Sequence, residues 1–242
     1  MVSTEPTASR WTSAWPDVLA FALGLGVARF AGWTTTDLVW SLWLSSLIVG
    51  YSMIVWMIVR PALAIARGAR RDASLTRQAF AQGRLPVMAG AGILVGGGLF
   101  MLAFFTVHFG GFHYVHSQFL NGFFPIDGAP PGRGGSAGMD TYLEVLRRYW
   151  TFLPAAFLAE RSAFQRFTVS AMFNGASKSQ MPGAMLAPYR NVLRMHSLIF
   201  VFAFAHFAGI DGFVLYAIVY AVYFFPWRLV RRPEATAAAA TE

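Results

Sequence analysis

The sequence contains no cysteine and little charge. The absence of cysteine excludes disulfides, iron–sulfur clusters and thiolate metal sites. Charged residues make up 12% of the chain and hydrophobic residues 56%, whereas a soluble domain carries about 25% charged residues. Also missing are a Walker loop, a dinucleotide-binding glycine fingerprint, a Gly-x-Ser-x-Gly elbow and a His-Glu-x-x-His motif. The composition therefore predicts a membrane protein, and no motif assigns it a known reaction.

Long apolar runs take the place of the missing charge. A run of about 20 apolar residues is long enough to cross a bilayer as a helix. Six such runs are predicted, over about residues 16–31, 37–59, 86–124, 142–164, 188–209 and 212–226. The predicted fold class is therefore all-α, a polytopic transmembrane helical bundle of about six spans. We expect a single domain over residues 1–232 and a disordered tail over residues 233–242.

Two of these runs are irregular. At about 1.5 Å per residue, the third run would be almost twice as long as the roughly 30 Å core of a bilayer. We expect a kink or break in it at Gly110 and Gly111. The fourth run carries charge at both ends and is predicted to be tilted or partly covered by protein. Gly92 and Gly96 have the spacing of a close helix–helix contact, which we expect to form within the chain.

The distribution of charge predicts the topology. The formal net charge is +8, and among the loops between the runs and the C-terminal segment, nearly all arginines follow the second, fourth or sixth run. The other loops are acidic and contain only one arginine. The positive-inside rule then places both termini in the cytoplasm. We expect the chain in an inner (plasma) membrane. The predicted partners are the lipid bilayer and other membrane-protein subunits, and no nucleic acid is expected.

Three of the five histidines, His108, His113 and His116, lie in one apolar stretch. The other two, His196 and His206, lie in the fifth run. Ionisable residues inside a membrane are candidates for a functional site by default. The predicted topology makes the third and fifth runs parallel. It therefore brings His206 to the outer side, at a depth similar to the first three histidines, and leaves His196 nearer the cytoplasm.

A metal site is one hypothesis for these histidines. His113 and His116 are neighbours on a helix, three residues apart, and are close enough to share one ion. With His206, or with His108 as the alternative, they supply the three protein ligands of an open zinc or iron site. A base or fourth ligand would come from the outer-side acids Asp127, Asp140, Glu144 and Asp211.

Two other interpretations remain open on the residues alone. One histidine from each of two parallel spans could ligate a haem, and a single histidine suffices for a chlorophyll-type tetrapyrrole. Alternatively, the histidines form hydrogen bonds between membrane helices, each contributing on the order of 1 kcal/mol. The aromatic side chains nearby would suit a flat macrocycle and ordinary packing equally well.

Three stretches together resemble an uncharacterised family of bacterial and archaeal integral membrane proteins, known only as a domain of unknown function. They are Gly32-Trp33 with residues 42–50, residues 108–116, and Pro188-Tyr189-Arg190 with Met195-His196. The resemblance implies a polytopic α-helical protein and selects His108, His116 and His196 as the cofactor-binding residues. This chain departs from the family pattern at Ser45 or Ser46, where the members carry an acidic residue.

Three functions follow as hypotheses. The first is an accessory or structural membrane subunit with an outer-side histidine site for a metal or tetrapyrrole. The first alternative is an intramembrane metal-dependent hydrolase, in which the histidines activate water. The second alternative is a small transporter or channel with the histidines along a polar path. The accessory subunit is favoured because the sequence places no acid or nucleophile clearly beside the histidines.

Overall fold

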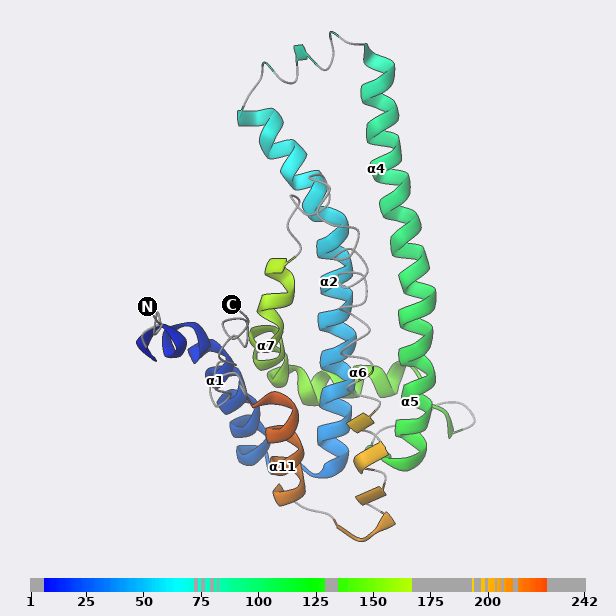
Figure 1. Ribbon diagram of the computed structural model, residues 1–242. Helices are drawn as coiled ribbons and strands as arrows, with labels where there is room; N and C mark the ends of the chain where they lie inside the picture. Colours follow the sequence, from blue (N-terminus) through cyan, green and yellow to red (C-terminus); the bar gives the residue numbers. More distant parts are fainter. Residues whose placement is uncertain are drawn as a thin grey trace, which may run out of the picture.

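The computed structural model is helical throughout the part of the chain that it describes. The described residues are 7–71, 74, 77–78, 81, 83–128, 135–166, 193, 197–198, 200–202, 204–205, 207–210 and 213–225. Every regular element among them is a helix, and none of them forms a strand (Figure 1). This confirms the predicted all-α class.

Helix α2 (Thr35–Arg71) extends well past the end of the second apolar run. It begins at a capping box, in which the Asp37 carboxylate accepts hydrogen bonds from the amide and the hydroxyl of Thr34, at 2.8 and 2.7 Å. The helix continues through Pro61, so the predicted end near residue 59 is wrong. The alanines, leucine and arginines that follow Pro61 are strong helix formers, and they keep the basic segment helical.

The third apolar run forms one continuous helical column beside α2. It consists of α4 (Arg84–Phe105), a π-helical turn η1 (Thr106–Gly110) and α5 (Gly111–Phe123). The predicted break at Gly110 and Gly111 is wrong, because both residues have helical backbone angles. The irregularity is instead a wide π turn that ends at Gly110. Such a turn rotates the side chains that follow without ending the helix.

The fourth apolar run is divided between two helices. They are α6 (Met139–Tyr149) and α7 (Leu153–Arg166), joined by a 3₁₀ turn η3 (Trp150–Phe152). A single continuous helix over residues 142–164 is therefore wrong. Pro154 lies in the first turn of α7, where its missing N–H costs no helical hydrogen bond, and it favours a new helix there. Helix α6 runs crosswise to α2, whereas α7 packs against α1 and α2 (Figure 1).

Helices α1 (Thr7–Phe30) and α11 (Phe213–Phe224) correspond to the first and sixth apolar runs and contact each other. The rings of Phe21 and Tyr220 are stacked, with centroids 5.3 Å apart. Gly24 permits this contact, because a Cβ there would overlap the Tyr220 ring. Only half of the fifth run, over residues 188–209, is among the described residues.

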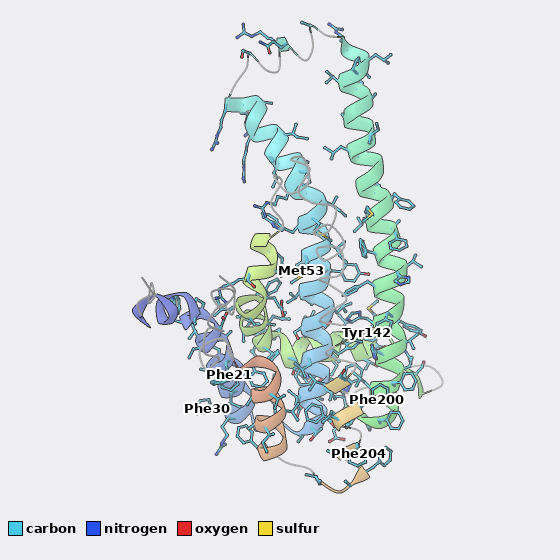
Figure 2. All side chains as sticks on the ribbon, viewed as in Figure 1. Phe21, Phe30, Met53, Tyr142, Phe200 and Phe204 are labelled. Carbon is cyan, nitrogen blue, oxygen red and sulfur yellow. The ribbon has the colours of Figure 1, made fainter. Side chains whose placement is uncertain are left out.

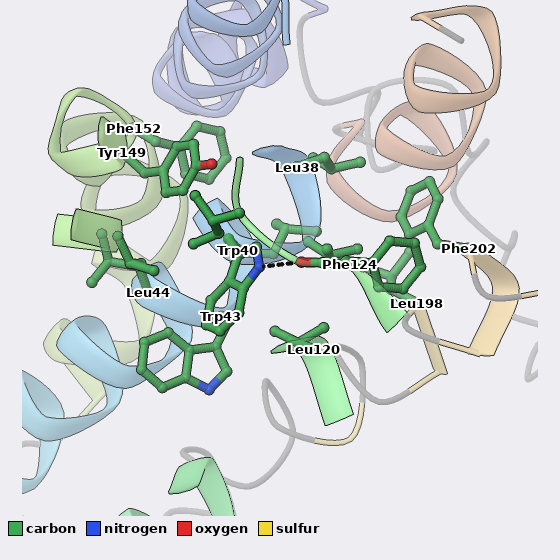
Figure 3. Packing of buried hydrophobic residues seen from close by; sticks show 14 of the residues in the cluster. Leu38, Trp40, Trp43, Leu44, Leu120, Phe124, Tyr149, Phe152, Leu198 and Phe202 are labelled. Carbon is green, nitrogen blue, oxygen red and sulfur yellow. Dashed lines mark hydrogen bonds between the residues drawn. The ribbon is translucent and has the colours of Figure 1, made fainter. Parts of the chain in front are cut away.

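The main core lies where α2 meets α5 (Figure 3). Trp40 is fully buried, and its indole N–H donates a hydrogen bond to the Phe124 carbonyl at 2.8 Å. Trp43 donates in the same way to the His113 carbonyl at 3.0 Å. A buried indole N–H needs such a partner. The two tryptophans therefore fix the depth of α2 relative to α5.

Glycines decide where α2 and the α4–α5 column approach closely. A Cβ at Gly50 would lie 2.2 Å from the ring of Phe109, so only glycine fits there without a shift. By contrast, Gly92 and Gly96 are exposed, and no atom of the described residues lies within 4 Å of a Cβ built there. The expected contact within the chain at Gly92 and Gly96 is therefore wrong for the described part.

Two helices among the described residues are long and apolar enough to cross a membrane. One is Thr35–Arg71, in which 50% of the most apolar 18-residue stretch is buried. The other is the column Arg84–Phe123, in which none of the corresponding stretch is buried. Helices α6, α7 and α11 are shorter. The count of six spans stays a prediction.

Candidate histidine site

The structure describes three of the five histidines and places them in two environments. His113 and His116 lie on the buried face of α5 and are 1% and 6% exposed. His108 lies in the π turn and is exposed, with its ring stacked on Phe104. His196 and His206 lie outside the described residues. The two predicted sets, His113–His116–His206 and His108–His116–His196, therefore stay predictions.

The hydrogen bonds of His113 determine its tautomer. Its Nδ1 lies 2.9 Å from the Phe109 carbonyl, which can only accept, so Nδ1 carries the proton. Its Nε2 lies 3.2 Å from the Ser46 hydroxyl. In the neutral ring Nε2 is an acceptor, so Ser46 donates to it. Both ring nitrogens are thus used within the protein. Nε2 would be free for a metal only if the Ser46 hydroxyl turned away.

Aromatic and hydroxyl side chains from α2, α5 and α6 surround His113. The Phe109 ring lies 4.3 Å from the imidazole, and Trp43 stacks on Tyr142 at 5.5 Å. Ser117 donates to the Tyr114 carbonyl at 2.6 Å, so the Tyr142 hydroxyl, 2.8 Å away, donates to Ser117. Polar contacts therefore join α5 to both neighbouring helices: His113 bonds Ser46 on α2, and Ser117 bonds Tyr142 on α6.

Sequence reasoning missed the partners of His113. Trp43 and Ser46 are three residues apart and therefore share a helix face, but nothing in the sequence shows that this face meets α5. The resemblance pointed to Ser45 or Ser46 as the position that is acidic in the family. The structure distinguishes the two, because Ser46 faces His113 whereas the Ser45 hydroxyl donates to the Leu42 carbonyl at 2.9 Å.

Two acids near the start of α2 and on α6, Asp37 and Glu144, are held by residues other than the histidines. Hydrogen bonds from Arg147 and Arg148 lower the pKa of Glu144 to about 2. Asp37 accepts a hydrogen bond from the Tyr149 hydroxyl at 2.8 Å. Burial, with this carboxylate as the second cause, raises the pKa of Tyr149. Among the described residues, no three histidine or acidic side chains come close enough to hold a metal ion.

The surroundings of His108 differ from those of His113. A shallow apolar hollow lies along one side of the α4–α5 column, lined by Phe100, Ala103, Phe104, Val107 and His108. His108 supplies the imidazole beside an otherwise apolar surface. This surface has the character that a macrocycle ligand needs, but the residues lining it come from a single helical column.

Comparison with known proteins identifies the chain by family alone. No curated protein and no solved structure matches it significantly. A family model matches residues 3–225, which is nearly the whole chain. The match agrees with the predicted resemblance to an uncharacterised family. The chain therefore belongs to a family of unknown function (DUF6498).

Proposed function

We propose that the chain is a multi-pass integral protein of the bacterial inner membrane and serves there as an accessory or structural subunit. The observation that carries this proposal is the exposure of the column Arg84–Phe123, in which no residue of the most apolar 18-residue stretch is buried. A water-soluble monomer rarely exposes so large a contiguous apolar surface. In a bilayer the same surface is covered by lipid at no cost, because acyl chains are as apolar as the side chains.

Exposed aromatic side chains on other helices support the same location. Phe30, Phe200 and Phe204 are 93%, 73% and 76% exposed (Figure 2). The charge distribution supports six spans with both termini in the cytoplasm, within one domain over residues 1–232. Under this topology the capped start of α2 and the end of α5 lie at the outer side.

A structural role is favoured over catalysis by the bonding of the described polar groups. Both nitrogens of His113 are hydrogen-bonded, and the carboxylates of Asp37 and Glu144 are held by Tyr149 and by two arginines. Groups bonded in this way stabilise helix contacts and are not poised to transfer a proton. No comparable observation in the described part of the chain favours the hydrolase or the transporter.

The histidine site is a second element of the proposal. His113 and His116 are both buried, three residues apart on one face of α5, which is the spacing of two ligands to one ion. We propose that they form the outer-side site for zinc or iron with His206, the Ser46 hydroxyl turning away from His113 Nε2 when the ion binds. The alternative occupant is a haem or chlorophyll-type tetrapyrrole on His108, His116 and His196.

The membrane location is tested by labelling single cysteines, because the natural chain has none. Asp127→Cys is expected to react with a membrane-impermeant maleimide in intact spheroplasts, whereas Arg67→Cys should react only after lysis. Both side chains are exposed, so a difference reports sidedness and not burial. The protein should also stay in the membrane fraction after alkaline carbonate extraction. Extraction into the soluble fraction, or equal labelling of both variants before lysis, would contradict the proposal.

The histidine site is tested by elemental analysis and absorption spectroscopy of the purified protein. We expect one zinc or iron per chain, lost in the His113→Ala/His116→Ala double variant and retained in His108→Ala. A tetrapyrrole would instead give a Soret band, and the band should disappear in His108→Ala. Natural protein that is free of metal and colourless would overturn the site and leave the structural role of the histidines.

A further inference from the structure

Helix α6 presents three different surfaces. Successive residues are separated by about 100° around a helix, so positions three, four and seven apart share a side. One side is buried against the bundle through Thr141, Val145 and Tyr149. A second side is apolar but between 41% and 71% exposed, and we call it the α6 stripe: Met139, Leu143 and Leu146, continued by Trp150 at the start of η3. The third side carries the charged residues Asp140, Glu144, Arg147 and Arg148.

The contacts of α6 show which way each surface is directed. The Arg148 guanidinium donates to the Asp127 carbonyl at 2.7 Å, and Asp127 lies just beyond the end of α5. Tyr149 bonds Asp37 in the first turn of α2. Helix α6 therefore crosses the bundle near the start of α2 and the end of α5 (Figure 1). The charged side is directed outward, toward Asp127.

The α6 stripe is directed the other way. It lies opposite Arg148 around the helix, and therefore on the side toward the middle of α2 and α5. In a membrane that surrounds α2 and α5, this side of α6 faces the acyl chains. Trp150 ends the stripe, and tryptophan is enriched at the level where acyl chains meet headgroups.

From this geometry we infer that α6 lies flat along the outer face of the inner membrane. The α6 stripe then lies among the acyl chains, and Arg147 lies at the level of the lipid phosphates. The inference rests on the proposed membrane location. In-plane helices of this kind gain affinity from buried apolar area and from basic residues near anionic headgroups. Glu144 stays ionised at neutral pH, because Arg147 and Arg148 lower its pKa to about 2. Asp140 lies on the same side, so the two arginines and the two acids of the charged side balance at neutral pH, and the apolar stripe is the main source of the affinity.

The inference is tested by spin-label accessibility in the full-length protein, reconstituted in nanodiscs of phosphatidylcholine and phosphatidylglycerol. Single cysteines are introduced at Leu143 and Leu146 in the stripe and at Asp140 and Arg147 on the charged side. Leu99→Cys on α4 is the reference for a lipid-facing position, since Leu99 is 63% exposed. All five positions are exposed, so the labels should be accommodated without refolding.

We expect the ratio of oxygen to nickel-complex accessibility to be several-fold higher at Leu143 and Leu146 than at Asp140 and Arg147, and similar to the ratio at Leu99. Equal, water-like ratios at all four α6 positions, with a lipid-like ratio at Leu99, would overturn the inference and leave the membrane location intact. Protection of the stripe from both reagents would also overturn it, because a protein surface would then cover α6. A water-like ratio at Leu99 would instead contradict the proposed function.

Discussion

Replacing Trp40 with alanine is expected to lower the free energy of unfolding by about 3–5 kcal/mol, the usual cost of truncating a large buried aromatic residue. Trp40 is fully buried between α2 and the end of α5. The change opens a cavity and leaves the Phe124 carbonyl without the indole N–H that now lies 2.8 Å away. Thermal unfolding of the detergent-solubilised protein, followed by circular dichroism, measures the effect.

Two further variants separate the causes of the Trp40 effect. Trp40→Phe keeps most of the packing and removes the hydrogen bond, so it should cost about 1–3 kcal/mol, the penalty of a buried carbonyl left without a donor. Trp150→Ala is the matched control, because Trp150 is 58% exposed, and its unfolding temperature should change little. If Trp40→Ala and Trp150→Ala had equal effects, the burial of Trp40 at the contact between α2 and α5 would be wrong.

Replacing Gly50 with alanine is expected to destabilise the protein by about 1–3 kcal/mol, the typical cost of overpacking a filled core. A Cβ at Gly50 would lie 2.2 Å from the Phe109 ring, and that ring is only 1% exposed and has little room to move. A shift of Phe109 would also disturb His113, whose Nδ1 donates to the Phe109 carbonyl. Thermal unfolding in detergent measures the loss of stability, and tryptophan fluorescence measures the disturbance around His113.

The control for Gly50→Ala is Gly96→Ala on the exposed side of α4. No atom of the described residues would meet the new methyl group, and alanine is the better helix former by about 1 kcal/mol, so stability should be unchanged or higher. The double variant Gly50→Ala/Phe109→Leu removes the overlapping ring and should recover part of the stability lost in Gly50→Ala. Equal losses from Gly50→Ala and Gly96→Ala would contradict the close contact between α2 and the π turn.

The helical class and the approximate positions of the apolar helices follow from sequence pattern, because apolar content and helix propensity are local properties. The boundaries were less accurate. The second apolar run indicated an end near residue 59 that α2 does not have, and Gly110 and Gly111 indicated a break that the π turn replaces.

The candidate site depends on contacts that local sequence pattern does not predict. Sequence pattern selected the histidines, but it could not separate His108 from His113, because the π turn changes which side of the column each residue faces. Nor could it supply Ser46 or Tyr142, since these partners are 67 residues before His113 and 25 residues after Ser117 in the chain. Such pairs depend on how helices pack, which no local spacing encodes.

Residue types and near neighbours are enough to predict the helical class, the apolar character and the grouping of histidines. The division of residues 139–166 into a crosswise helix and a separate one, and the bonding of His113 through both ring nitrogens, became known from the fold. Both have one cause. The direction of α6 and the bonding of His113 are determined by contacts with α2 and α5, in which distant parts of the chain satisfy each other's buried polar groups.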